Sequence, residues 1–251
     1  MVSPGGFVLV TGGSRGIGAA TARLAAEQGY DVCISYRDRA DSAQAVVADL
    51  EATGVRALAV RADVSQEQDV VRLFATARAE LGRLMGLVNN AGVLDRQSTV
   101  ADLVAERIQR ILAVNVLGAF LCAREAVRAM STADGGLGGA IVNVSSRAAV
   151  LGGAGEYVDY AASKAAVDAL TVGLSREVAD VGIRVNAVRP GLIETEIHAS
   201  GGEPARVGRL GPTVPMGRGG SAEEVAEAIV WLLSDKASYV TGSFIEVSGG
   251  R

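Results

Sequence analysis

The chain has 251 residues and a formal net charge of −4, with 49% apolar and 21% charged residues. This apolar fraction excludes an intrinsically disordered chain, and the presence of only two cysteines, Cys33 and Cys122, excludes a disulfide scaffold. The slightly acidic balance without a basic block argues against nucleic acid and membranes as partners. No apolar run approaches the about 20 residues that span a bilayer, and no basic segment precedes the N-terminal apolar run. We therefore expect a cytoplasmic protein with reduced thiols.

Apolar segments typical of buried strands alternate along the chain with segments typical of helices. The expected strands cover residues 7–11, 31–35, 57–61, 84–89, 139–144, 183–188 and 243–247. Helices are expected up to residue 28, over 40–53, from residue 65, and over 103–130, 158–181 and 221–234. Apolar strands separated by helices indicate a parallel sheet covered on both faces. We predict one doubly wound α/β (Rossmann) domain over residues 1–251, with a parallel seven-stranded sheet.

Local signals refine this outline at three places. Ser65 with Gln68, and Ser221 with Glu224, have the spacing of a capping box, which satisfies free N–H groups at a helix start. Residues 191–220 are rich in glycine and proline and too long for an ordinary connection, so they form either a mobile lid or a disordered stretch. We interpret them as a substrate-binding lid. The last helix carries Trp231 on a segment that we expect in the core.

A glycine-rich turn, Thr11 to Gly18, directly follows the first strand. Glycines at such positions allow a sharp turn, close approach of the backbone to a pyrophosphate, and tight packing of helix on sheet. The helix N-terminus then offers free N–H groups to the anion. The alternative is a tight turn that binds no ligand. The turn predicts a dinucleotide site that includes Gly12, Ser14, Arg15, Gly16, Ile17 and Gly18.

The end of the second strand bears on the identity of the dinucleotide. An acidic side chain there would favour NAD(H), whereas this chain has Tyr36 and Arg37, with Arg15 in the glycine turn. Two guanidinium groups suit a dianionic 2′-phosphate, so NADP(H) is favoured over NAD(H). The alternative is that Asp38 and Asp41 pair with Arg37 in a solvated cluster.

Tyr160 and Lys164 lie one helical turn apart, on one face of the helix expected over 158–181. Lys164 is one of only two lysines in the chain. An ammonium about 4 Å from a phenolate stabilises it by about 4 kcal/mol at an effective dielectric near 20, an upper estimate because desolvation opposes it. The pair therefore predicts a tyrosine whose pKa is lowered toward neutrality, unless the spacing is incidental.

Taken together, these motifs resemble the short-chain dehydrogenase/reductase family in its compact form, including glucose/ribitol dehydrogenase-like and 3-oxoacyl-reductase-like members. The resemblance covers essentially the whole chain, and its specificity comes from the order and spacing of motifs that are individually weak. They are Thr11–Gly18, Asp63-Val64, Asn89-Asn90-Ala91-Gly92, Asn115, Ser145-Ser146, Tyr160 with Lys164, and Pro190-Gly191.

The resemblance implies four catalytic residues. Tyr160 exchanges a proton with the substrate oxygen, and Ser146 holds that oxygen by a hydrogen bond. Lys164 binds the nicotinamide ribose and lowers the pKa of Tyr160. Asn115 supports a water that links Lys164 to solvent, while Ser145 is structural.

It also implies contacts with the dinucleotide. Asp63 and Val64 contact adenine, and Ile193 and Thr195 hold the carboxamide. The remaining contacts that the resemblance implies are Asn90, Ala91, Gly92, Pro190 and Gly191, together with Tyr160 and Lys164.

Two aromatic side chains near these motifs are open to more than one interpretation. Tyr157 precedes Tyr160 by three residues and is either a packing residue or part of the substrate pocket, with packing favoured. His198 is the only histidine; we expect it to be solvated, with a substrate contact as the alternative. The cysteines and this histidine have no metal-site spacing, so no metal is expected.

The sequence therefore predicts an NADP(H)-dependent oxidoreductase that moves a hydride between nicotinamide and a carbonyl or secondary alcohol, acting as a carbonyl reductase. Its partner is a small molecule. The main alternative is a non-catalytic or regulatory NADP(H)-binding protein on the same fold. A sugar-nucleotide epimerase is disfavoured because such relatives have a longer C-terminal substrate domain. By resemblance, we expect a homotetramer or homodimer.

Overall fold

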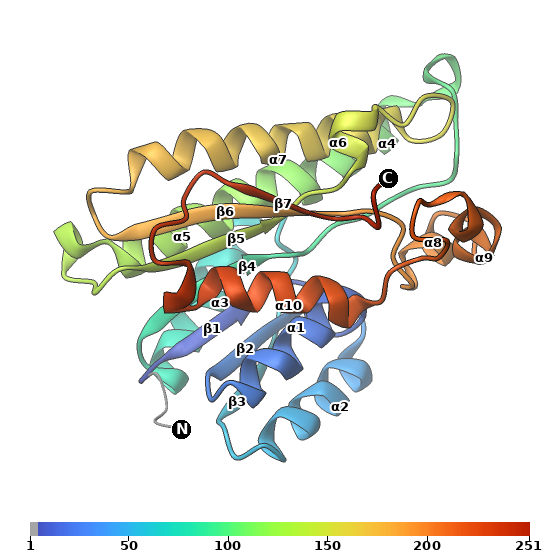
Figure 1. Ribbon diagram of the computed structural model, residues 1–251. Helices are drawn as coiled ribbons and strands as arrows, with labels where there is room; N and C mark the ends of the chain where they lie inside the picture. The colour runs from blue at the N-terminus through green and yellow to red at the C-terminus, as the bar shows by residue number, and fades with distance from the viewer. Residues whose placement is uncertain (1–4) are drawn as a thin grey trace.

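The computed structural model describes residues 5–251 and contains one parallel seven-stranded sheet, which confirms the predicted fold class (Figure 1). The strand order is β3-β2-β1-β4-β5-β6-β7. From β1 the chain continues to β2 and β3 on one side of the sheet, and then crosses to β4 on the other side of β1. Such a change in strand order creates a crevice at the carboxyl ends of the strands, where ligands bind. The strands are β1 (Phe7–Val10), β2 (Asp31–Tyr36), β3 (Ala57–Arg61), β4 (Leu84–Asn89), β5 (Gly139–Val144), β6 (Ile183–Pro190) and β7 (Phe244–Val247).

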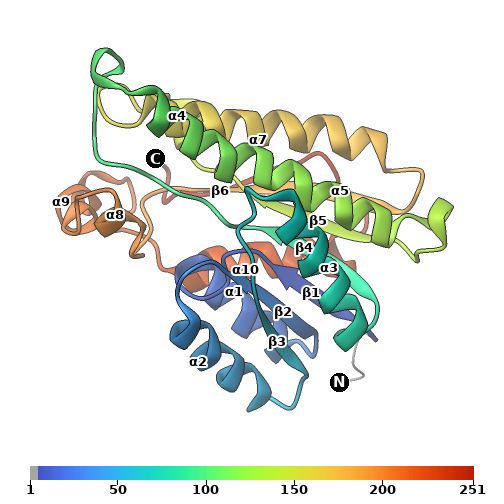
Figure 2. The same cartoon turned by 180° about the vertical axis from the view of Figure 1, so that it is seen from behind.

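Helices cover both faces of the sheet (Figures 1 and 2). One face carries α1 (Gly16–Glu27), α2 (Ala40–Glu51) and α10 (Ala222–Leu233). The other carries α3 (Glu67–Leu81), α5 (Gly118–Met130) and α7 (Val158–Glu177). The shorter helical segments outside residues 191–220 are η1 (Val100–Asp102), α4 (Ala105–Leu112), η2 (Ala113–Leu117), η3 (Thr132–Asp134), α6 (Ala148–Leu151) and η5 (Asp235–Ala237).

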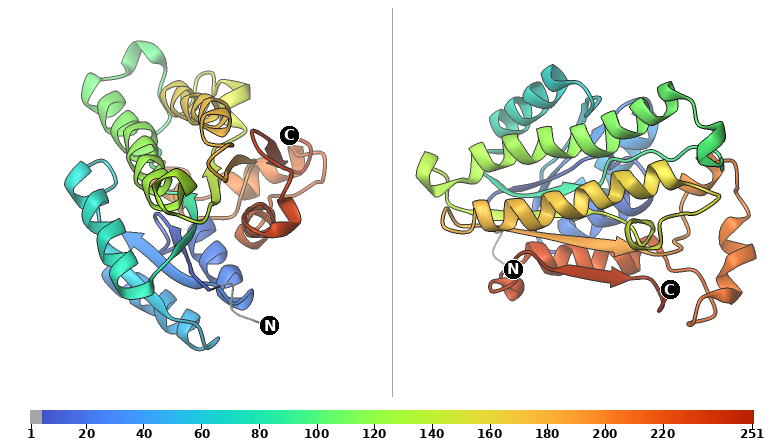
Figure 3. Two further views of the ribbon diagram at one scale, coloured as in Figure 1. Left: turned by 90° about the vertical axis from the view of Figure 1, so that its left-hand side faces the viewer. Right: turned by 90° about the horizontal axis from the view of Figure 1, so that it is seen from above.

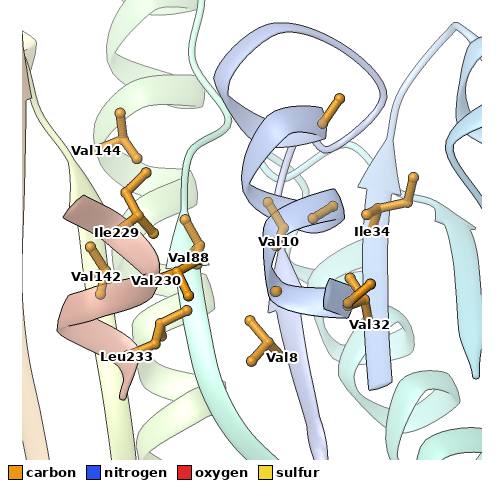
Figure 4. Close-up of a cluster of buried hydrophobic side chains, with 14 of the residues drawn as sticks. Val8, Val10, Val32, Ile34, Val88, Val142, Val144, Ile229, Val230 and Leu233 are labelled. Atoms are coloured by element: carbon orange, nitrogen blue, oxygen red, sulfur yellow. The ribbon is translucent and has the colours of Figure 1, made fainter. Parts of the chain in front are cut away.

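Two apolar layers hold the helices to the sheet. In the first, Val8, Val10 and Val88 point from the strands toward Ile229 and Leu233 of α10 and toward α1 (Figure 4). The second lies on the opposite face, where alternate residues of the same strands meet α3 and α5. Strands that are apolar on both sides are buried on both sides, as the sequence pattern predicted.

The single helix expected over 103–130 is divided into three parts. A π-helical segment, η2, separates α4 from α5 and contains Asn115. The Asn115 side chain is 1% exposed, and it both donates to and accepts from the backbone of Val93. A π turn inside an α-helix often marks a functional position, and here it holds Asn115 toward the strand ends.

Two expectations for other helices are wrong. Ser65 does not cap α3, because its hydroxyl donates to Asp63 Oδ1 and the helix begins later, after Gln66. Trp231 is 39% exposed, since it lies on the side of α10 that faces away from the sheet. By contrast, both hydrogen bonds of the capping box between Ser221 and Glu224 are present.

Residues 191–220 fold into short elements at the carboxyl end of the sheet, rather than the disordered stretch that was the alternative (Figure 1). They include α8 (Ile197–Ser200), α9 (Arg206–Leu210) and η4 (Gly211–Thr213). Glu194 N donates to the Gly220 carbonyl at 2.8 Å, so the two ends of this segment are joined. The segment stands beside the chain end in two views (Figure 3).

Candidate active site

The glycine turn between β1 and α1 has the backbone geometry that its sequence predicted. Gly12 and Gly16 have φ angles of +64° and +52°, which favour glycine. A Cβ atom at Gly18 would lie 2.5 Å from both Asn90 Nδ2 and the Gly12 carbonyl oxygen. Asn90 Nδ2 itself donates to the Thr11 carbonyl at 2.8 Å, which ties the end of β4 to the turn. Gly18 therefore allows close packing beneath the turn and does not line the cavity above it.

A cavity of about 260 Å³ lies above the turn, at the strand ends. It brings together most of the predicted dinucleotide contacts: Gly12, Ser14, Arg15, Gly16, Ile17, Tyr36, Arg37, Asp63, Val64, Asn90, Ala91, Gly92 and Thr195. Arg39 lines the same cavity and was not predicted. Its place just beyond the second strand, two residues after Arg37, was the signal that could have revealed it.

The arginines at this end differ in their surroundings. Arg37 Nε donates to Asp38 at 2.7 Å in an exposed pair, and this hydrogen bond raises the Arg37 pKa. The predicted alternative pairing thus exists for Asp38, while no ion pair joins Arg37 to Asp41 within residues 5–251. Arg15 Nη1 is buried and has no hydrogen-bond partner in the described chain. Burial, followed by the neighbouring Arg39, lowers the pKa of Arg15.

A second cavity of about 190 Å³ joins the first, because Ile17, Asn90, Gly92, Thr195 and Ile197 line both. Ser146, Tyr160 and Lys164 lie in its wall. The predicted dinucleotide contacts Pro190, Gly191 and Ile193 line this second cavity only. The two cavities therefore adjoin, and together they extend from the arginines to Tyr160.

The electrostatics of Tyr160 correct the sequence-based prediction. Although the Tyr160 side chain is partly exposed along the cavity, its ionising oxygen is enclosed, and burial raises its pKa to about 12. A hydrogen bond with Ser146 opposes that shift. The predicted lowering is wrong because Lys164 Nζ donates to the Val144 carbonyl at 2.7 Å and lies 5.7 Å from the centre of the Tyr160 ring. Desolvation therefore outweighs the attraction of the ammonium.

Lys164 is strongly affected by the same burial. Its side chain is buried, and desolvation lowers its pKa to about 8, with Asp168 acting in the opposite direction. A Cβ atom at Gly92 would lie 3.5 Å from both Lys164 Nζ and Asn115 Oδ1, so the two atoms border the same space. Asn115 Nδ2 also donates to Ser163 Oγ at 3.0 Å. Asn115 thus stands behind the cavity wall rather than in it.

The two serines at the end of β5 have separate surroundings, in keeping with the predicted division between them. Ser145 Oγ donates to the backbone carbonyl of Lys164 at 3.3 Å, so it holds α7 against the strand end. Ser146 lines the cavity, and its Oγ accepts from Ala148 N at 3.1 Å. Both serines line the cavity, but only Ser146 acts on Tyr160, where it opposes the rise in the pKa.

The substrate end of the cavity contains residues that were missed or misjudged. Tyr157 is buried, as the favoured packing interpretation predicted, and it also lines this cavity. His198 also lines the cavity, with Nε2 2.9 Å from the Ile193 carbonyl oxygen, and the expectation of a solvated side chain is wrong. Arg206 was missed: its side chain is 7% exposed and pairs with Glu156 and Glu203. The pair with Glu203, three residues earlier, is local, whereas Glu156 lies 50 residues away and no local pattern could reveal that pairing.

None of the residues that the structure describes form a group of three or more His, Cys, Asp or Glu side chains that could hold a metal ion. No helix among them combines the length and apolar character needed to cross a membrane.

Comparisons with known proteins match this arrangement. The family model described as Enoyl-(Acyl carrier protein) reductase matches residues 12–251. An Escherichia coli protein named Uncharacterized oxidoreductase YgfF is 60% identical over 245 residues, covering 98% of this chain and 99% of that protein. The Cis-4-hydroxycyclohexanecarboxylate dehydrogenase of Sinomonas cyclohexanicum is 44% identical, covering 96% of this chain and 94% of that protein.

Solved structures agree with the sequence matches. A short chain dehydrogenase from Burkholderia cenocepacia in complex with NADP has a TM-score of 0.89 and 35% identity, covering 98% of this chain and 97% of that one. A 3-ketoacyl-(acyl-carrier-protein) reductase from Brucella melitensis complexed with NADH has a TM-score of 0.90 and 32% identity, covering 98% of each chain. With its glycine turn, Tyr160 and Lys164 arranged on this sheet, the chain belongs to the short-chain dehydrogenase/reductase family and is an NAD(P)-dependent oxidoreductase.

Proposed function

We propose that the protein is an NADP(H)-dependent carbonyl reductase that interconverts a ketone or aldehyde and its alcohol. The observation that carries this proposal is the pair of adjoining cavities, which places an arginine-lined glycine turn next to Ser146, Tyr160 and Lys164. Bound NADPH supplies the hydride, and the protein supplies alignment and electrostatics. The relatives named as a dehydrogenase and a ketoacyl reductase support a substrate with a carbonyl or secondary alcohol.

The residues present fit an NADP-type dinucleotide. Arg15 lines the first cavity, and its buried Nη1 has no hydrogen-bond partner among residues 5–251, so it can donate to an anionic ligand. The turn from Gly12 to Gly18 would hold the pyrophosphate, with Arg15, Arg37 and Arg39 at the 2′-phosphate. The other predicted contacts from Tyr36 to Thr195 would hold the adenine, ribose and nicotinamide, since they line the two adjoining cavities.

The proposed roles at the reacting end follow from the charge states there. With a pKa of about 12, Tyr160 carries its proton at neutral pH and can donate it to a carbonyl oxygen, as reduction requires. Ser146 donates a hydrogen bond to the same oxygen and orients it. Lys164, fixed by the Val144 carbonyl, would hold the nicotinamide ribose. Asn115 would position a water beside Lys164, since its Oδ1 borders the same space.

The preference for NADP(H) is tested by removing single guanidinium groups. Arg15→Ala and Arg37→Ala should each raise the Kd of NADPH by about tenfold or more, because a charge-assisted hydrogen bond is lost, and change the Kd of NADH little. Arg23→Ala is the matched control: Arg23 pairs with Asp49 on an exposed face outside the cavity. Equal affinity of the native protein for both cofactors would refute the preference.

The reaction is tested by following NADPH absorbance with a panel of carbonyl compounds that begins with cyclohexanones. We expect consumption of NADPH that depends on the added carbonyl. If NADPH binds and no carbonyl is reduced, the non-catalytic alternative holds.

Three further features belong to the same proposal. Residues 191–220 act as the lid of the cavity, which Arg206 supports by joining α9 to Glu156 before α7.

The exposed Leu112, Leu117 and Phe120 on α4, η2 and α5 support association into a homotetramer or homodimer. Multi-angle light scattering of native protein and a Phe120→Glu variant tests that assembly. The unpaired, buried thiols of Cys33 and Cys122 support a cytoplasmic location.

A further inference from the structure

The charged side chains at the substrate end of the cavity are largely matched with one another. Arg206 donates to Glu203 at 2.6 Å and to Glu156, and Gln97 bridges the same two carboxylates. Arg147 donates to Glu246 and to the backbone carbonyl of residue 251. Because these guanidinium groups already have acceptors, neither of them requires an anionic substrate.

Two neutral polar groups in the same wall are unmatched. The Tyr157 hydroxyl and His198 Nδ1 are buried and have no hydrogen-bond partner among residues 5–251. Gln97 lies near the hydroxyl, but not in hydrogen-bond geometry. Both groups are electrostatically coupled to Arg206 and Glu203, so they belong to one part of the wall. Buried polar groups without partners are costly, and a ligand that pairs with them relieves that cost.

The hydrogen-bonding roles of these groups can be assigned. His198 Nε2 lies 2.9 Å from the Ile193 carbonyl oxygen, and since a carbonyl only accepts, Nε2 must carry the hydrogen. Burial lowers the pKa of His198, which favours the neutral ring. His198 Nδ1 is then an acceptor. The Tyr157 hydroxyl can donate, and the Arg206 guanidinium, 5.2 Å from the ring centre, packs over its ring.

We propose that Tyr157 and His198 together recognise a hydroxyl group of the substrate, which is therefore a neutral hydroxy ketone or the corresponding diol. A hydroxyl can donate to His198 Nδ1 while it accepts from Tyr157. A carboxylate has no hydrogen to donate, and a hydrocarbon pairs with neither group. Tyr157 and Tyr160 line the same cavity, so the recognised hydroxyl and the reacting carbonyl belong to one molecule. This inference rests on the proposed carbonyl reduction.

The test compares NADPH-dependent kcat/KM for cyclohexanone, methylcyclohexanones and hydroxycyclohexanones with the substituent at each ring position. We expect at least one hydroxy ketone to exceed its methyl counterpart by about tenfold or more. Tyr157→Phe and His198→Gln should each remove most of that ratio, which is taken between the two ketones within the same protein and is therefore independent of any general change in turnover. Glutamine keeps a donor at the position of Nε2 and removes the Nδ1 acceptor. Tyr239→Phe, at a fully exposed tyrosine, is the matched control.

The outcomes separate this inference from the function on which it rests. If ketones are reduced and the ratio of kcat/KM between hydroxy and methyl ketones is the same in native and variant proteins, the inference is overturned while the proposed carbonyl reduction stands. A preference for oxocyclohexanecarboxylate over every hydroxy ketone would move recognition to Arg251, which also lines the cavity, and would overturn it too. Calorimetric binding of the hydroxy ketones to Tyr160→Phe protein gives a readout without turnover, and equal binding of the methyl ketones would contradict it. Failure to reduce any carbonyl would defeat the proposed function itself.

Discussion

The two ends of the cavity are built in different ways. At the glycine turn, arginine side chains line a wall whose base is strand ends and backbone: Thr11 Oγ1 accepts from the backbone N–H groups of Asn90 and Ala91, and Gly18 lets the helix pack closely. At the substrate end, the wall consists of side chains from distant segments, held by Arg206 and its two carboxylates. A wall made of backbone is rigid, whereas one held by side-chain ion pairs can open. Under the proposed function, the first end binds the cofactor and the second end selects among substrates.

Tyr160 stands where the two ends meet, and its replacement should have the largest effect. Tyr160→Phe removes the proton donor and should reduce kcat by about 10²–10⁴-fold. The Kd of NADPH should remain within about twofold, because the arginine end is untouched. Steady-state kinetics and fluorescence titration measure the two quantities, with Tyr239→Phe as control. Unchanged turnover would remove the proton-transfer role.

The rigid end is tested by adding a single methyl group. Gly18→Ala places a Cβ atom against Asn90 and the Gly12 carbonyl, so it should lower the free energy of unfolding by about 1–3 kcal/mol and weaken NADPH binding. Gly208→Ala in α9 is the matched change in the lid, where no described atom would lie within 4 Å of the new Cβ. It should be neutral or slightly stabilising. Urea unfolding of both variants checks the comparison, and equal destabilisation would contradict it.

The end held by Arg206 is tested by breaking its ion pairs. Arg206→Met should loosen the lid, raise the KM of the carbonyl substrate several-fold and leave the Kd of NADPH nearly unchanged. Its carboxylate partners are partly exposed, so water can solvate them, and we expect global stability to fall by about 1–2 kcal/mol rather than the larger loss seen for fully buried pairs. Limited proteolysis should cut residues 191–220 faster in the variant. If the variant is cleaved no faster than native protein, Arg206 does not hold residues 191–220 in place.

The last prediction concerns the pH dependence of stability. The folded-state pKa of Lys164 is about 8, below its ordinary 10.5, so the unfolded chain binds this proton more tightly. The cost of burying the ammonium is present below pH 8 and is relieved as the pH rises toward 10.5, so this group makes stability rise across that window. Lys164→Met should lack that rise. Urea unfolding at both ends of the window measures it, and parallel pH profiles for the two proteins would argue against a buried ammonium.

What the sequence could predict follows the same division. The strands 57–61, 84–89 and 139–144 have the bounds read from their apolar runs, since local pattern determines them. The glycine turn and its dinucleotide contacts follow from a short motif of the same local kind. Other features depend on tertiary contacts that a local pattern does not contain. They are the exposure of Trp231, the ion pair of Arg206 with Glu156, and the hydrogen bond of Ser65 with Asp63. The pKa of Tyr160 was misjudged for the same reason: helical spacing predicted the approach of Lys164, but not the Val144 carbonyl that holds its ammonium.

We propose that the two adjoining cavities together hold one NADP-type dinucleotide, with its phosphate end at Arg15 and its reacting end at Tyr160. A crystal structure of the protein with bound NADP⁺ tests this most directly. We predict that Arg15 Nη1 donates to the 2′-phosphate and that the nicotinamide ring lies beside Tyr160, within the space bordered by Asn90, Gly92 and Thr195. A 2′-phosphate bound away from Arg15 and Arg37, or a nicotinamide ring outside the cavity that contains Tyr160, would contradict it.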